Sequence, residues 1–155
     1  MIRRRSFITL LGGAAAWPMA ARAQQRERMR RIGVFSPLTA DDPQVLGRNA
    51  AFLQGLQELG WTVGRNVHID YRFSAGDPER HRRYAAELVV LAPDVILATG
   101  PLTVAALQQA NASMPIVFVN LVDPVSSAFV ESLARPGGNI TGFTQFEYAL
   151  GGKWL

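Results

Sequence analysis

The sequence of 155 residues contains no cysteine, which excludes disulfide bonds, a thiol nucleophile, cysteine-ligated zinc and a lipid-modified cysteine anchor. It contains two histidines, with no cluster of metal-ligating residues around them. The signature motifs of dinucleotide-binding and phosphate-binding loops, serine hydrolases and zinc proteases are also absent. These absences leave a chain long enough for one domain without an evident metal or cofactor site.

The N-terminal stretch is too short to span a membrane. Its uncharged segment, Phe7–Ala21, has 15 residues, whereas a bilayer-spanning helix needs about 20. Arg4 and Arg5 precede this segment, and Ala21 and Ala23 form a small-x-small site at its end. This layout is typical of a cleavable secretory signal, and the paired arginines resemble the twin-arginine type, which exports folded proteins. We expect export and cleavage after Ala23, with an uncleaved anchor or a basic arm as alternatives.

The positive charge is concentrated at the N-terminus. The whole chain has a net charge of +4, with 16 basic and 12 acidic residues. Four of the arginines lie within residues 1–23, and without them the charges balance, which argues against a nucleic-acid partner. A smaller basic cluster from Arg26 to Arg31 overlaps residues 24–30, which we expect to be a solvated linker. Contact of this cluster with a phosphate or a membrane surface is the alternative.

Apolar strand patterns alternate with helical patterns from residue 31 onward, which predicts an α/β fold with a doubly wound parallel sheet covered on both faces. The second strand alternates apolar with polar residues, which indicates an edge position and the strand order 2-1-3-4-5. Strands are predicted at 32–35, 67–73, 94–98, 116–119 and 140–143, and helices at 44–59, 78–91, 103–111 and 125–134.

Ligands of such sheets bind beyond the carboxyl ends of the strands, where the strand order reverses. Polar residues and a glycine lie at the predicted strand ends, and the glycine would let a ligand approach the backbone. The following helix N-terminus favours a carboxylate. The candidate ligand-binding residues are Ser36, Thr99, Gly100, Thr103, Asn120 and Asp123.

Asp-Pro pairs precede three of the predicted helices. Aspartate caps free backbone N–H groups, and proline suits the first helical position, so helix capping is expected for Asp42 and Asp77. Asp123 follows a central strand at the predicted ligand edge, so ligand contact and capping both remain open there. We expect both histidines to be solvated, His68 on the polar face of the edge strand and His81 on a charged helix face.

Two long segments carry a resemblance. The segments "LQELGWTVGRNVHIDYRFSAGDPERHRRYAAELVVLAPDVILATG" and "PIVFVNLVDPVSSAFVESLARPGGNITGF" resemble the ABC transporter substrate-binding protein family of the tryptophan/tyrosine type. The resemblance covers nearly all of residues 31–155. It implies a type I periplasmic binding protein, in which two α/β lobes joined by a hinge close over a small ligand. It also implies a periplasmic location, no enzymatic activity and an ABC permease as partner.

Members of that family are longer than this chain. The resemblance therefore implies that residues 31–143 form the first lobe and that 144–155 begin the crossover into a second lobe, so that the chain is a fragment. Because both lobes contribute contacts in a closed cleft, we expect the chain alone to bind ligand weakly or not at all.

The mechanism that the resemblance implies is capture without chemistry. The ligand would be a small polar, amino-acid-like molecule, either an aromatic amino acid or another one. Its carboxylate would lie at helix N-termini near Thr103 and Val125. Asp123 would accept a hydrogen bond from its ammonium group, and Ser36 and Thr99 would donate further hydrogen bonds. Hinge closure would then present the complex to the permease.

Two other classes of protein remain open from the residues alone. The first is an exported α/β hydrolase-like enzyme, which would use Ser36 with Asp123, although no base is evident beside them. The second is the effector lobe of a transcription regulator. That reading needs an N-terminal pair of DNA-binding helices, and the export signal occupies this position.

Overall fold

The computed structural model of the chain describes residues 29–144. The expected crossover beyond Thr144 and the export signal lie outside these described residues. Within the described part, none of the helices combines the length and the apolar character needed to cross a bilayer. The signal residues that lie outside it are Arg4, Arg5, Phe7, Ala21 and Ala23.

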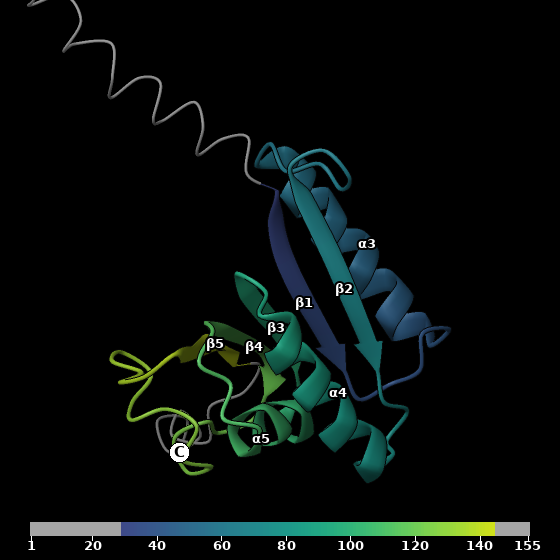
Figure 1. Cartoon of the computed structure of the whole chain (residues 1–155). Helices are drawn as coiled ribbons and strands as arrows, with labels where there is room; N and C mark the ends of the chain where they lie inside the picture. Colours follow the sequence, from purple (N-terminus) through teal and green to yellow (C-terminus); the bar gives the residue numbers. More distant parts are fainter. Residues whose placement is uncertain (1–28, 145–155) are drawn as a thin grey trace, which may run out of the picture.

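Five parallel strands form one sheet in the order β2-β1-β3-β4-β5. This confirms the predicted order, and the strand with alternating residues does lie at an edge. The parallel arrangement brings the carboxyl ends of all five strands to one side of the molecule (Figure 1). The strands are β1 (Arg30–Ser36), β2 (Val67–Phe73), β3 (Val95–Thr99), β4 (Ile116–Leu121) and β5 (Ile140–Thr144).

Three helices connect these strands: α3 (Pro43–Glu58), α4 (Pro78–Leu91) and α5 (Pro101–Gln109). The Asp42 carboxylate accepts from a backbone N–H in the first turn of α3, and Asp77 does the same at α4. Helix capping is therefore confirmed for both residues.

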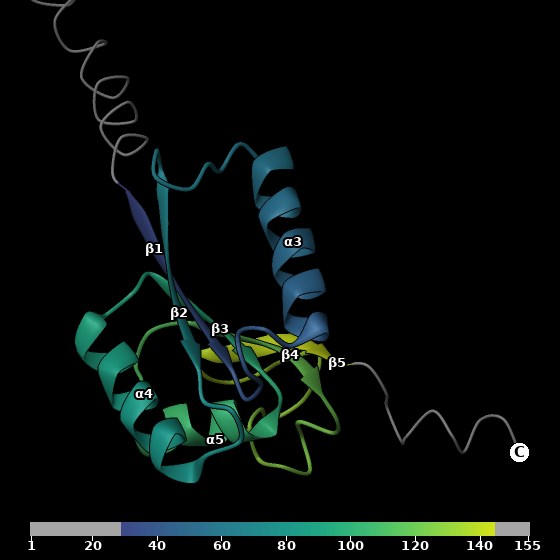
Figure 2. The same cartoon turned by 90° about the vertical axis from the view of Figure 1, so that its right-hand side faces the viewer.

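α4 and α5 lie on one side of the sheet and α3 on the other (Figure 2). The main core fills the space between the sheet and α4 and α5, where Phe35 and Phe118 pack against Leu88 and Leu107. The face of the sheet toward α3 is covered less completely, as the half-buried side chain of Leu97 in β3 shows. This incomplete cover leaves room for a cavity on the α3 side.

The basic cluster before the first strand is partly ordered by carboxylates. β1 begins at Arg30, whose guanidinium lies 2.8 Å from an Asp94 carboxylate oxygen. The backbone N–H of Arg31 donates to the other oxygen of Asp94, and its side chain lies 3.2 Å from Asp70. These two arginines thus belong to the sheet, and their partners are side chains of the same domain.

Helix α5 begins earlier than predicted, at Pro101 instead of residue 103. Gly100 adopts a φ of 79°, a left-handed conformation that glycine accepts readily, and so turns the chain directly after β3. Pro101 then occupies the first helical turn. The helix ends before Asn111, whose φ of 54° is incompatible with a continuing right-handed helix.

The helix predicted over 125–134 does not form. Residues 124–128 make a turn in which the Ala128 N–H donates to the Val125 carbonyl. Ala128 then takes a φ of 56°, which stops helical propagation. Three serines and two valines within residues 125–134 give this segment a weak helical propensity, so the turn prevails. The expected helix N-terminus near Val125 is therefore absent from the described structure.

The prediction that His81 is a solvated residue is wrong. His81 is 6% exposed and packs against the Phe35 ring, with 5.8 Å between ring centroids. Its spacing from Ala85 and Leu88 places all three on the buried face of α4. Arg80, Arg82 and Arg83 flank His81 in sequence and make this part of the helix resemble a charged, solvated face. His68 is exposed, as expected.

Candidate functional site

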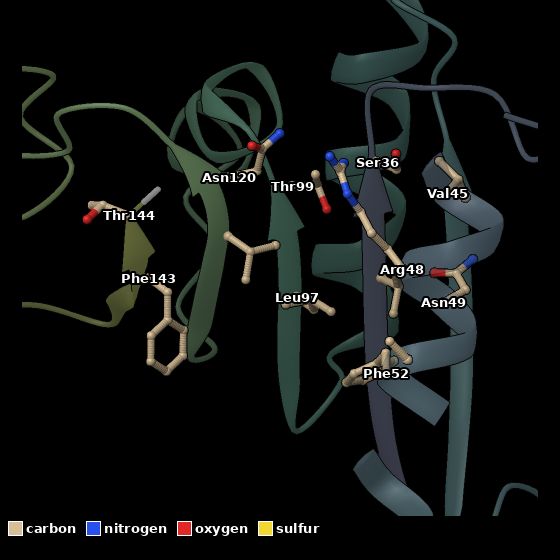
Figure 3. A pocket seen from close by; sticks show the side chains of 13 residues that line it. Ser36, Val45, Arg48, Asn49, Phe52, Leu97, Thr99, Asn120, Phe143 and Thr144 are labelled. Carbon is tan, nitrogen blue, oxygen red and sulfur yellow. The ribbon is translucent and has the colours of Figure 1, made fainter. Parts of the chain in front are cut away.

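A cavity of about 390 Å³ lies between the sheet and α3, at the carboxyl ends of the central strands (Figure 3). Three of the predicted site residues, Ser36, Thr99 and Asn120, line it together. Its deeper wall is apolar and comes from β1, β3, β4 and α3. The remaining lining residues are Val34, Val45, Arg48, Asn49, Ala51, Phe52, Leu97, Val119, Phe143 and Thr144.

Ser36 ends β1 and is held in place by the chain around it. Its hydroxyl oxygen accepts from the Leu38 N–H at 3.2 Å, which closes the turn that follows the strand. Its carbonyl oxygen accepts from the Ser74 N–H at 3.0 Å and lies 3.1 Å from the Ser74 hydroxyl. The side chain is 4% exposed and lines the cavity, so a ligand there meets a fixed hydroxyl.

The turn after β3 carries three of the predicted residues, and they differ in their positions. Thr99 lines the cavity at the end of the strand. Gly100 supplies the left-handed turn, and its N–H donates to the Val119 carbonyl. Thr103 is fully buried, and its hydroxyl lies 3.0 Å from the carbonyl oxygens of Thr99 and Gly100. The Thr103 side chain therefore supports the turn from within instead of capping α5, and neither it nor Gly100 lines the cavity.

Asn120 lies at an irregularity in the pairing of β4 with β5, between Phe118 and Leu121. It adopts a φ of 57°, a conformation that asparagine tolerates better than most residues. Strained positions of this kind cluster at functional sites. The irregularity places the Asn120 amide at the mouth of the cavity, where it offers both a donor and an acceptor.

Asp123 follows β4 but does not line the cavity. Its carboxylate accepts from the Ser126 N–H at 3.0 Å, in the manner of a cap. Hydrogen bonds from the Ser126 hydroxyl and N–H lower the pKa of this carboxyl. The structure does not bring Ser36 and Asp123 together in the cavity, so it offers no support for a nucleophile with its base there.

Sequence reasoning missed the residues of α3 that line the cavity. Arg48, Asn49 and Phe52 share the face of α3 that carries the buried Val45. This spacing of three, four and seven residues from Val45 is the signal that identifies them. The Arg48 side chain extends from α3 toward Ser36 at the strand ends (Figure 3).

Within residues 29–144, the cavity has one charged lining residue, Arg48, and otherwise neutral polar and apolar ones. In the described part of the chain, Arg48 takes part in none of the ion pairs, and its guanidinium donates to the Gln44 side-chain oxygen at 3.0 Å. Residues 29–144 contain no group of three or more histidine or acidic side chains that would hold a metal ion. The arrangement suits a small molecule with an apolar body and a polar head.

Comparison with known families and proteins gives a consistent result. The model of the family described as ABC transporter substrate binding protein matches residues 32–149. A tyrosine-binding protein from Clostridioides difficile is 26% identical over 120 residues, which are 77% of this chain and 34% of that protein. The chain therefore spans about a third of the length of this curated relative.

Solved structures share the fold. A conserved domain protein from Vibrio cholerae superposes with a TM-score of 0.72 at 28% identity, over 82% of this chain and 42% of that one. The ABC domain from Streptococcus pneumoniae in complex with L-Trp gives 0.68 at 26%, over 75% and 38%. The ligand-free, open form of a substrate-binding protein with adhesive properties from Clostridium difficile gives 0.70 at 24%, over 76% and 39%.

Proposed function

Because the chain belongs to the ABC transporter substrate-binding protein family, we propose that its cavity captures a small amino-acid-like ligand with an aromatic side chain. The observation that carries this proposal is the position of Ser36, Thr99 and Asn120 at the mouth of an apolar cavity. Relatives that are named for tyrosine binding or contain L-Trp support the aromatic ligand.

In this proposal the ligand binds without reacting. Its ring packs against Phe52 and Leu97, and its polar head forms hydrogen bonds with the strand-end side chains. Gly100 and Thr103 act on the ligand indirectly, because they set the turn that presents Thr99. Asp123 likewise shapes the loop after β4, because its carboxylate is engaged by Ser126.

The setting of this activity is also part of the proposal. We infer that the twin-arginine-like signal directs the chain to the periplasm, where it delivers ligand to an ABC permease. The family assignment supports transport instead of catalysis or gene regulation.

Titration of the isotopically labelled 155-residue chain with L-tryptophan and L-tyrosine, followed by NMR, tests the proposal. We expect saturable shifts at cavity residues with weak affinity, because a wall residue, Phe143, is 74% exposed and leaves the ligand partly in water. The Ser36→Ala and Thr99→Val variants should weaken binding, whereas Ser113→Ala, in the exposed loop between α5 and β4, should not. Absence of saturable shifts at millimolar ligand would contradict the proposal.

A further inference from the structure

We propose that Arg48 is the specificity-determining residue of the cavity, and that it binds the carboxylate of a ligand whose ammonium group, if present, is not recognised. This inference rests on the proposed function of the cavity and narrows its ligand class to apolar carboxylates. Arg48 was not among the strand-end residues that the sequence pattern nominated. Its assignment follows from where α3 lies relative to the sheet.

Arg48 lies on the face of α3 that packs toward the sheet. Val45, one turn earlier, is 4% exposed and anchors this face of the helix to the sheet. Phe52, one turn later, lines the apolar part of the cavity. Arg48 lies between them, with its guanidinium directed to the mouth beside Thr99 and Ser36 (Figure 3). A ligand whose ring reaches Phe52 therefore has its head beside Arg48.

The charge of the described cavity lining comes from Arg48. Arg48 is the only charged lining residue, and none of the ion pairs in the described part of the chain includes it. Within residues 29–144, its guanidinium donates to the neutral side chain of Gln44, which leaves further N–H groups for a ligand. The planar guanidinium matches the two oxygens of a carboxylate, and hydrogen bonds between two charged groups are stronger than neutral ones.

The described lining of the cavity offers no carboxylate that could pair with a ligand ammonium group. Among residues 29–144, neither aspartate nor glutamate lines the cavity. The Asp123 carboxylate, which the sequence suggested for an ammonium group, is capped by Ser126 and lies outside the lining. An ammonium group near Arg48 would meet a like charge, and burial would cost it hydration without a compensating partner. The charge of Arg48 in the described lining therefore favours an anion over a cation.

Three probes with the same indole ring separate these charges. Indole-3-propionate carries the carboxylate alone, L-tryptophan carries both groups, and tryptamine carries the ammonium alone. We expect the 155-residue chain to bind indole-3-propionate at least as tightly as L-tryptophan, and tryptamine most weakly. The variant Arg48→Gln should lose about tenfold or more in affinity for indole-3-propionate, and Arg48→Lys should retain part of it. Tryptamine binding should not weaken in either variant.

The matched control is Arg65→Gln, which removes an exposed arginine of the turn before β2, away from the cavity lining. It should leave all three affinities unchanged. If L-tryptophan binds and Arg48→Gln leaves the affinity for both carboxylates intact, the role of Arg48 is overturned while the proposed function stands. Tryptamine binding as tightly as indole-3-propionate would also overturn it. If no probe shows saturable binding, both the inference and the proposed function fail.

Discussion

The Nε2 atom of His81 lies 3.1 Å from the hydroxyl oxygen of Ser74, and both side chains are buried. The Nδ1 atom lies 2.8 Å from the Asp77 carbonyl, which only accepts hydrogen bonds, so Nδ1 carries a proton. The Ser74 hydroxyl donates its single proton to the carbonyl oxygen of Ser36 at 3.1 Å, so this pair links α4 to the end of β1 that lines the cavity.

Replacing Ser74 by alanine should destabilise the fold, because it leaves His81 Nε2 without its buried partner. A loss of about 1–3 kcal/mol in the free energy of unfolding is expected for an unsatisfied buried polar group. Urea unfolding measures it, with Ser113→Ala in the exposed loop between α5 and β4 as the control. Equal stability of the two variants would show that the Ser74–His81 contact contributes nothing.

The substitution Gly142→Ala should disrupt the pairing of β5 with β4. A Cβ atom at this position would lie 2.1 Å from the Phe118 carbonyl oxygen, which is backbone and cannot move away without breaking the sheet. We expect a loss of about 3 kcal/mol or more, at the upper end for overpacking. Thermal unfolding is the measurement. In the control Gly138→Ala, a Cβ atom would meet no atom within 4 Å, so it should unfold close to the wild type.

Acid should weaken the contribution of Asp77 to stability. Backbone N–H donors at Arg80 and Glu79, with a smaller effect from the charges of Arg80 and Arg83, lower the pKa of this carboxyl from its ordinary value of 3.8. Because the folded pKa is the lower one, the contribution is present above about pH 4. It is lost as pH falls through the folded value.

The comparison with Asp77→Asn measures this effect, because asparagine keeps the capping geometry but has no charge to lose. The difference in unfolding free energy between the wild type and Asp77→Asn should shrink as the solution is acidified below about pH 4. Asp77→Ala removes the cap itself and should be the least stable variant at neutral pH. A constant difference across the acid range would contradict the lowered pKa.

Conservative changes to the paired arginines should reveal the export route. The twin-arginine pathway reads a pair of arginines as an address, whereas the general secretory pathway requires only positive charge before the apolar segment. The double variant Arg4→Lys, Arg5→Lys should therefore remain in the cytoplasm when cell fractions are compared. Arg3→Lys is the charge-matched control and should be exported. Export of the double variant would favour the general secretory route.

Much of the fold was predictable because it depends on local patterns. The alternating residues of β2 placed it at an edge, and the apolar runs of β3 and β4 placed them at the centre, as the sheet order confirms. The predictions that failed depended on context. The helix predicted over 125–134 does not form, because Ala128 adopts a positive φ. Helix α5 begins at Pro101, two residues earlier than predicted, because Gly100 before it adopts a positive φ and turns the chain.

The residues of the candidate site were likewise predictable only in part. The rule for strand ends identified Ser36, Thr99 and Asn120, because parallel strands present their carboxyl ends together. It could not identify Arg48, because the rule contains no information on which helix residues point over the sheet. The burial of His81 follows from its spacing to Ala85 and Leu88, although the charged residues beside it in sequence indicate a solvated face.

The sequence by itself determined the order of the strands, the caps at Asp42 and Asp77 and the family, since each follows from residue patterns read along the chain. Only the tertiary structure decided which side chains share the cavity. Arg48 and Thr99 are far apart in sequence, and the packing of α3 on the sheet brings them into the same cavity. The charge of a binding site is a sum over such distant neighbours, so it exists only once the chain has folded.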